Sequence, residues 1–267
     1  MLDGKITFLC FSILVMAPDK GGVLSPRLFA RYIRDLLHDV VSSGVGCNVG
    51  GVMFNILAYA DDIVLLAPSW RGLQILLDIL YAHIGGIDML VNANKSVCMV
   101  FNPKVQSKTV SKSFPLFSIG SNALKFVNCF KYLGHKIMQC GSDDDDIQRE
   151  ICNMFVRTNI VNRRFSKCSR EVKIQLFKSY CLCLYDVALW KHFTVAIIGK
   201  MRSCYNRCIK IFFGYKRMDS MTNILIELGL PNFDVLLERC RASFVHHWAG
   251  CDNILVRHLQ VLVCNIM

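Results

Sequence analysis

Two adjacent carboxylates, Asp61 and Asp62, sit in the segment YADD at 59–62, and apolar residues flank them throughout 56–67. This spacing predicts a tight hairpin with buried arms and a projecting tip. Neighbouring carboxylates repel each other, so at least one would hold a proton unless a cation joined them. Mg²⁺ suits the pair because it takes carboxylate oxygens and keeps positions open for water and phosphate. The residues alone leave two interpretations open: a metal site for phosphoryl transfer and a plain Asp-Asp turn.

The elements around this hairpin mix helices and strands. A helix is expected to begin at Ser25, a good N-cap, with Pro26 at the first helical position. A second helix is expected from Ser69 to about Ile84, with leucines at helical spacing facing inward. Short strands are expected at 97–101, 124–127 and 132–138. The first ~140 residues therefore predict an α+β layer with an antiparallel sheet.

The pattern becomes helical after Gly141, which places a domain boundary between residues 1–140 and 141–267. The acidic run 143–146 suits the first turn of a helix, where it complements the dipole; a metal site is the alternative. One apolar helix face is expected to hold Leu176, Tyr180, Leu184, Val187 and Leu189. Gly214, Gly229 and Pro231 interrupt the remainder.

Composition indicates a globular, basic protein. Hydrophobic residues make up 53% of the 267, and the formal net charge is +11. Residues 121–267 hold 21 Lys and Arg against 12 Asp and Glu, which favours a polyanionic partner for this half over an ordinary solvated surface. The 14 cysteines include no CxxC pair and fit small buried hydrophobes in an intracellular, reducing compartment, cytoplasm or nucleus. A zinc site from Cys240, His246, His247 and Cys251 is a weaker alternative, since the spacing matches no common finger.

The apolar run 6–17, ITFLCFSILVMA, is too short to span a bilayer, and Asp3 and the absence of a convincing cleavage site argue against a signal peptide. A buried strand is the preferred interpretation, and no membrane association is expected. A small membrane-anchored protein is the competing one. Pairing of this segment with the Asp61 hairpin would argue against the anchor.

Several motifs in order resemble reverse transcriptases, and more narrowly those of non-LTR, LINE-like retrotransposons. AYADDIVLLA at 58–67 resembles the catalytic hairpin, and GGVLSPRLFARYIRDLL at 21–37 the palm segment upstream. GLQILLDIL at 72–80 and VNANKSVCMVF at 91–101 resemble the helix, loop and strand that follow. FKYLGHKI at 130–137 resembles the primer-grip hairpin, residues 143–190 the thumb, and YNRCIKIFFG at 205–214 the tail of several animal elements. The resemblance covers nearly everything from residue 21 onward.

The resemblance implies a role for each matching residue. Asp61 and Asp62 would hold Mg²⁺ or Mn²⁺, and Lys95 would lie near the triphosphate as a general acid, or else be a solvated loop lysine. The nucleotide and template would be contacted by Lys20, Gly21, Gly22 and Tyr59. The primer strand would be held by Phe130, Tyr132, Leu133 and Gly134. The implied reaction is DNA synthesis from deoxynucleoside triphosphates on an RNA template with a DNA primer.

The chain also departs from the family pattern. Asp19-Lys20 stands where the family usually has Arg-Gln, and Ala30 where it has Asn. Nothing before Gly21 matches the segment with the first catalytic aspartate. We therefore expect that this chain alone does not polymerise, and that loss of the segment leaves an exposed edge in the palm sheet. A non-catalytic nucleic-acid-binding remnant of the same family is the alternative function.

A basic region in the thumb-like part is the candidate surface for an RNA–DNA hybrid. It comprises Arg157, Arg163, Arg164, Lys167, Arg170 and Lys173. Such a surface would follow the phosphates, and binding would weaken steeply with salt. Arg163, Arg164 and Lys167 are expected to contact the nucleic-acid backbone, and a basic surface without a ligand is the alternative.

Overall fold

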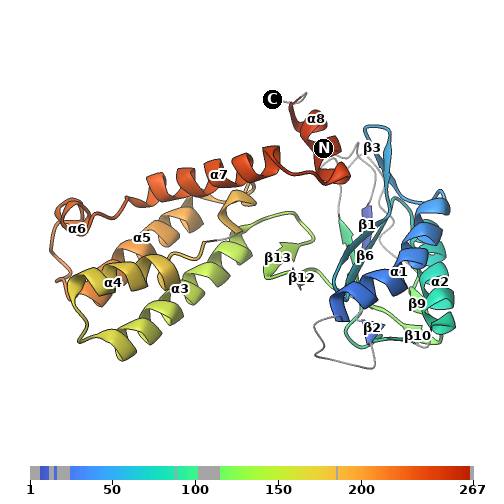
Figure 1. The fold of residues 1–267 in the computed structure, drawn as a ribbon, viewed down its shortest axis with the longest axis horizontal. Helices are drawn as coiled ribbons and strands as arrows, with labels where there is room; N and C mark the ends of the chain where they lie inside the picture. Colours follow the sequence, from blue (N-terminus) through green and yellow to red (C-terminus); the bar gives the residue numbers. More distant parts are fainter. Residues whose placement is uncertain are drawn as a thin grey trace. The chain divides into compact units, whose positions relative to one another are not determined.

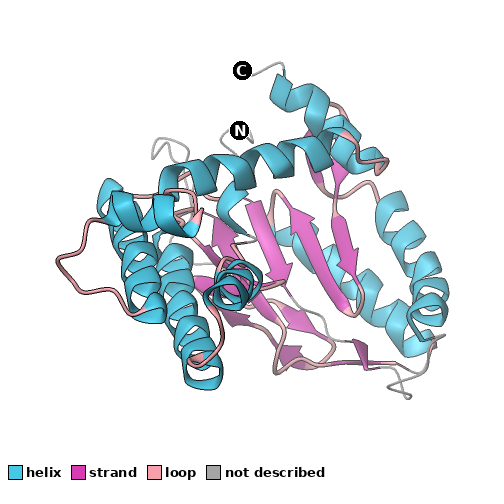
Figure 2. Ribbon diagram, turned by 60° about the vertical axis from the view of Figure 1, so that its left-hand side comes forward, coloured by secondary structure: helices cyan, strands magenta, loops and turns pink. Residues whose placement is uncertain are grey.

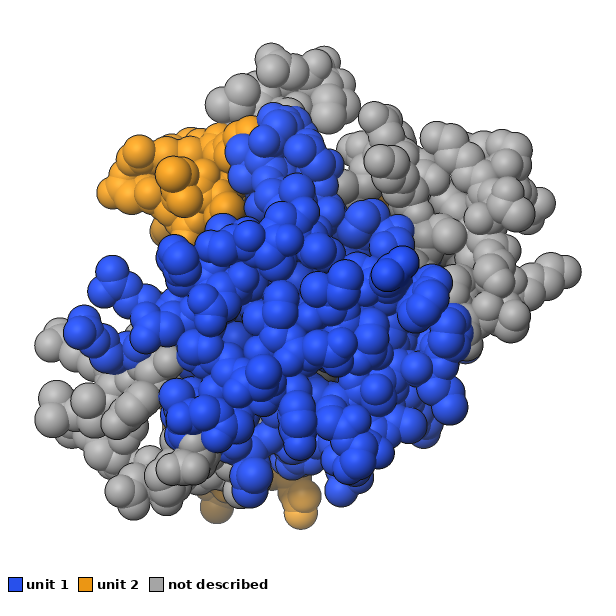
Figure 3. Space-filling model, turned by 90° about the vertical axis from the view of Figure 1, so that its right-hand side faces the viewer, with its two compact units in different colours: residues 1–141 blue, residues 142–267 orange. Residues whose placement is uncertain are grey.

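The computed structural model describes residues 7–11, 15–16, 25–87, 89–101, 115–184 and 186–264. The chain divides into two compact units, residues 1–141 and 142–267, coloured blue and orange in Figure 3. The first unit mixes strands and helices and the second is helical in its described part, so the α+β class is confirmed (Figures 1 and 2).

A five-stranded sheet forms the centre of the first unit, in the order β11-β8-β1-β6-β5. These strands are β11 (Lys125–Phe126), β8 (Val97–Phe101), β1 (Thr7–Phe11), β6 (Asp62–Ala67) and β5 (Ile56–Tyr59). All neighbours are antiparallel except β11 and β8. Two-stranded ladders join β2 (Val15–Met16) to β7 (Leu90–Val91), β3 (Cys47–Val49) to β4 (Val52–Phe54), β9 (Ser118–Ile119) to β10 (Asn122–Ala123), and β12 (Cys129–Tyr132) to β13 (His135–Met138).

Two helices, α1 (Ser25–Ser42) and α2 (Trp70–Gly86), pack on one side of this sheet (Figure 1). The expected helix starts are confirmed, and the Ser69 hydroxyl caps α2 by accepting from the Gly72 amide at 3.1 Å. The core beneath is apolar: Leu36 of α1 and the α2 residues Leu73, Leu76, Leu77 and Leu80 are all fully buried.

The described parts of the apolar segment at 6–17, residues 7–11 and 15–16, form strands, as preferred. β1 lies between β6 and β8, with Leu9 opposite Leu66 on one side and Met99 on the other. This pairing argues against the membrane-anchor interpretation. Within the described residues, no helix combines the length and apolar character needed to cross a bilayer.

The second unit is helical (Figure 2), and its helices from α3 to α7 pack around one hydrophobic core to which the described residues of α8 do not contribute. The helices are α3 (Asp144–Phe165), α4 (Arg170–Leu176), α5 (Val195–Phe213), α6 (Met221–Leu228), α7 (Phe233–Ala249) and α8 (Ile254–Cys264). Gly214 and Gly229 cap α5 and α6 with φ of 78° and 59°, a left-handed conformation that suits glycine.

The continuous apolar helix face expected from Leu176 to Leu189 is wrong. α4 ends at Leu176, a π-helical turn η1 (Phe177–Cys181) follows, and a 3₁₀ turn η2 (Asp186–Ala188) comes after it. Because the π-turn changes the angular spacing of side chains, Phe177 and Cys181 are buried while Tyr180 and Leu189 are exposed.

Candidate active site

The two carboxylates lie at the tip of the β5–β6 hairpin. Tyr59 pairs with Asp62, so Ala60 and Asp61 form a two-residue turn. Ala60 has φ of 50°, a left-handed conformation that is uncommon for a residue other than glycine. Asp61 is exposed, Asp62 is half-buried and Tyr59 is 65% exposed. The predicted hairpin with a projecting tip is confirmed, but the prediction that both arms are buried is wrong. Strand β6 is largely buried, whereas β5 lies at the end of the sheet with Leu57, Ala58 and Tyr59 exposed.

Strand β6 fixes this tip because it is buried on both faces. Ile63 and Leu65 are fully buried in the core under α2, and Val64 is 2% exposed on the opposite face. A one-residue slip of β6 would exchange the two faces, so the packing holds one register. The position of Asp62 at the end of β6 is therefore set by the apolar residues that follow it.

The β12–β13 hairpin packs on the face of the sheet opposite the helices. Phe130, Tyr132 and Ile137 contact the cluster around Val64 and Met99. Burial raises the pKa of the Tyr132 hydroxyl, and the negative charge of Asp62 raises it further. The structure thus brings Tyr132, expected in a primer grip, within electrostatic reach of a candidate metal ligand. Contact of this hairpin with a primer stays a prediction.

The turn of this second hairpin is backbone-strained. Leu133 has φ of 47° and Gly134 φ of 92°, and the Leu133 side chain is 51% exposed. Leucine in this conformation costs about 1 kcal/mol or more. Because the Leu133 side chain is exposed, its burial does not offset this conformational cost.

Lys95 lies at the same end of the sheet as Asp62. It is exposed in a turn that Asn92 holds by accepting from the Lys95 and Ser96 amides. β8 and β6 are both antiparallel to β1, and Val97, the first residue of β8, lies opposite Phe11 at the Asp62 end of β1. Because β1 lies between them, about 10 Å separates β8 from β6 across the sheet. A long lysine side chain reaches part of that distance, so the expected role near a triphosphate stays a prediction.

Strand β1, which pairs with β6 on the side away from β5, carries no carboxylate. β1 reaches the Asp62 end of the sheet at Phe11, and its sequence is TFLCF. The exposed edge expected in the palm sheet does not lie at this side of β6, because β1 pairs along it; the strands at the ends of the sheet are β5 and β11. Apolar composition alone did not show which strand lies beside the hairpin, because that pairing is long-range.

The donor chemistry of Asp61 and Asp62 suits one hard divalent cation, and binding of such an ion stays a prediction. Both offer carboxylate oxygens at a tip open to solvent, which leaves room for the waters that Mg²⁺ retains. The described part of β1 adds no third carboxylate to this donor set. The other residues expected at the nucleotide, Lys20, Gly21 and Gly22, lie outside the described residues.

The acidic run at 143–146 has a structural role, as preferred. Asp143 accepts from the amides of Lys191 and His192 at 2.8 and 2.7 Å, and Asp144 accepts from the amide and hydroxyl of Thr194 at 2.8 and 2.9 Å. These carboxylates hold the segment before α5 onto the start of α3.

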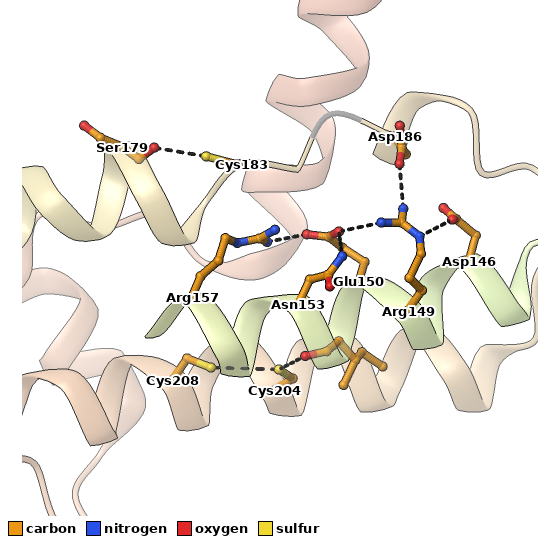
Figure 4. Close-up of polar contacts among 11 residues, drawn as sticks. Asp146, Arg149, Glu150, Asn153, Arg157, Ser179, Cys183, Asp186, Cys204 and Cys208 are labelled. Carbon is orange, nitrogen blue, oxygen red and sulfur yellow. Dashed lines mark hydrogen bonds and ion pairs between the residues drawn. The ribbon is translucent and has the colours of Figure 1, made fainter. Parts of the chain in front are cut away.

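Three of the six residues in the basic thumb-like region already interact with other side chains of the chain (Figure 4 shows the first pair). Arg157 pairs with the buried Glu150, Arg170 with Glu227 at 2.7 Å, and the Lys173 ammonium lies 5.2 Å from the Phe212 ring centre. The remaining three, Arg163, Arg164 and Lys167, are exposed around the end of α3. Their contact with nucleic acid stays a prediction.

The zinc alternative has no support in the part of the chain that the structure describes. No three of Cys240, His246, His247 and Cys251 bring ligand atoms within reach of a single ion there. His247 Nδ1 instead lies 2.7 Å from the Ser243 carbonyl of its own helix.

Comparison with known proteins matches residues 18–137 to the family described as Reverse transcriptase (RNA-dependent DNA polymerase). A curated relative, the Retrovirus-related Pol polyprotein from type-2 retrotransposable element R2DM of Drosophila melanogaster, is 33% identical over 118 residues. That similarity covers 43% of this chain and 11% of the relative's length. The matched segment contains β5, β6, α2, β8 and the β12–β13 hairpin.

Proposed function

Through residues 18–137 the chain belongs to the reverse transcriptases of non-LTR retrotransposons, and from this we propose that it is the later palm and a thumb-like part of an RNA-directed DNA polymerase. One observation carries the proposal: Asp61 and Asp62 lie at the tip of a hairpin that β6 anchors within this segment. The substrates would be deoxynucleoside triphosphates, an RNA template and a DNA primer.

In this proposal Asp61 and Asp62 hold Mg²⁺ or Mn²⁺, which when bound would stabilise charge on the transferring phosphoryl group. Tyr59, exposed next to the turn, offers an aromatic face to the primer end. Tyr132 lies on the Asp62 face of the sheet, so the β12–β13 hairpin can position a strand there. Lys95, exposed at the same end, would face the triphosphate and donate a proton to the leaving pyrophosphate.

We also propose that this chain alone does not polymerise. A two-metal site needs carboxylates from two separate strands, and β1 supplies none in its described residues. Without them the nucleotide is poorly positioned, and positioning is most of the catalysis in phosphoryl transfer. This observation favours the second candidate, a non-catalytic nucleic-acid-binding remnant of the same family.

A metal titration tests the site. Mg²⁺ or Mn²⁺ should raise the melting temperature of the wild-type chain, and Asp61→Asn should abolish that rise. Asp78→Asn is the matched control, because it makes the same chemical change at an exposed position of α2. This variant should keep the metal-induced rise in melting temperature. An equal metal response in the wild type and Asp61→Asn would refute metal binding at the hairpin.

Primer extension on an RNA template separates the two candidates. The purified chain should give no extension with either metal. Extension that disappears in Asp61→Asn would show that a carboxylate outside the described part of β1 completes the site.

The basic residues at the end of α3 have their own test. Neutralising Arg163, Arg164 and Lys167 together should weaken binding to an RNA–DNA hybrid and reduce the slope of log affinity against log salt by about 2 to 3. An unchanged slope would mean that these residues do not contact the ligand.

A further inference from the structure

A basic groove runs along helix α5 of the second unit. Two concavities of about 640 Å³ each adjoin there and share Ser203 and Arg207 among their lining residues. The first lies between α3 and α5 and includes Lys200; the second continues toward the end of α5 and includes Lys210 and Arg217. We name this surface the α5 groove.

The charge of the α5 groove is of one sign. Its lining includes the four cations Lys200, Arg207, Lys210 and Arg217, and no aspartate or glutamate among the described residues. Lys200, Ser203, Arg207 and Lys210 recur at spacings of three and four, so they share one helix face. They span about 15 Å along the axis. A concave surface with one sign of charge concentrates ligands of the opposite sign.

Three of the four cations are exposed, and two of these, Lys200 and Arg207, lie on α5, where they are placed to meet a ligand. The Arg207 guanidinium lies 5.7 Å from the centre of the Phe155 ring on α3, which holds it at the wall of the groove. Lys210 is less available, because its ammonium donates to the carbonyls of Arg217 and Asp219 at 2.8 and 2.7 Å. Lys210 therefore adds positive charge to the groove, but its ammonium is already held by two hydrogen bonds within the chain.

A glycine in the groove points independently to close approach of a ligand. Gly199 lies inside α5 and lines the first concavity. A glycine in a helix interior costs about 0.5–1 kcal/mol relative to alanine. A Cβ built there meets nothing within 4 Å, so the packing of this chain does not require glycine. A missing side chain beside Lys200 and Ser203 lets a phosphate approach the helix backbone closely.

We propose that the α5 groove binds the sugar–phosphate backbone of a nucleic-acid strand, through Lys200 and Arg207 and over the bare backbone at Gly199. The inference rests on the proposed function for the identity of the polyanion. It assigns a binding surface outside residues 18–137 and separate from the three basic residues around the end of α3. An acidic protein segment is the competing ligand, and the test below distinguishes the two.

The experiment measures binding of the full chain to a fluorescein-labelled single-stranded RNA of about 20 nucleotides, and to the matching RNA–DNA hybrid, across a KCl series. Lys200→Gln with Arg207→Gln should reduce the slope of log affinity against log salt by about 1.4 on the single strand, for two lost phosphate contacts. Lys178→Gln with Arg241→Gln removes the same charge from exposed positions outside the groove and should leave the slope close to that of the wild type.

Gly199→Ala supplies a second, uncharged change. It should raise the melting temperature of the chain and still weaken RNA binding several-fold, with the salt slope unchanged. Loss of affinity in a stabilised variant cannot come from unfolding.

Three results would overturn the inference. The first is an equal slope in the wild type and the groove double variant. The second is displacement of RNA by polyglutamate as efficiently as by unlabelled RNA, which would indicate an acidic protein partner. The third is no binding of RNA or hybrid by the wild type. In each case the metal response of Asp61, measured separately, shows whether the proposed function still stands.

Discussion

The buried carboxylate of Asp146 allows a quantitative test of how the second unit is held together (Figure 4). Asp146 has no exposed surface; it accepts from Trp190 Nε1 at 2.8 Å and from Arg149 Nε at 2.7 Å. Arg149 also bonds Asp186 at 2.7 Å. The network therefore ties the start of α3 to η2 and to the segment that leads into α5.

Asp146→Ala leaves the Trp190 N–H and the Arg149 guanidinium without this acceptor. Removing one partner of a buried ion pair typically costs about 3–5 kcal/mol when the other charge is left uncompensated. Because Arg149 keeps Asp186 and Glu150 as partners, the lower end of that range applies here. We expect a loss of that size, which is a factor of more than about 100 in the folding equilibrium constant. Asp145→Ala is the matched control: Asp145 lies in the same first turn but is exposed, so about 1 kcal/mol or less should be lost.

Urea unfolding of the full chain, followed by its helical circular dichroism, measures both losses. Trp190→Phe adds an independent check, because it removes the indole donor together with part of a buried ring and should cost at least about 1.5–3 kcal/mol. Equal destabilisation by Asp146→Ala and Asp145→Ala would refute the argument. It would mean that the dipole of α3, rather than the buried network, accounts for the acidic run.

Three further outcomes are expected. Burial raises the pKa of Cys181 to about 11, so its contribution to stability is complete below pH ~9 and lost as the pH rises toward 11; Cys181→Ala should flatten the alkaline decline in urea-derived stability. Asp62→Asn should lower the pKa of Tyr132 in a spectrophotometric titration, and Mg²⁺ should lower it in the wild type alone. Leu133→Gly should raise the melting temperature, because φ of 47° costs glycine little.

Each of these outcomes has a contrary result. An alkaline decline that is the same with and without Cys181 would place the titrating group elsewhere. A Tyr132 pKa that ignores both Asp62→Asn and Mg²⁺ would mean that no cation binds beside Asp62. A lower melting temperature in Leu133→Gly would show that the leucine side chain stabilises the hairpin after all.

Residue types and their spacing were enough to predict the local elements and the hairpin. Apolar runs on both sides of Asp61 and Asp62, the cap at Ser69 and the glycines at 214 and 229 are signals that act within a few residues, so the strands, helices and helix ends followed from them. The motif order from residue 21 onward likewise indicated the family. Alternatives stayed open wherever the deciding contact was long-range.

Which strands are neighbours and which charges are already paired became clear from the three-dimensional packing. β1 beside β6, and the absence of a carboxylate in it, depend on pairing across more than 50 residues, which residue types at close spacing do not specify. Arg157 and Arg170 looked as available as Arg163 until their partners Glu150 and Glu227 were located. The apolar helix face expected after α4 was also wrong because of long-range contacts. Phe177 and Cys181 are the buried residues there, since burial depends on which side chains of other helices pack against them.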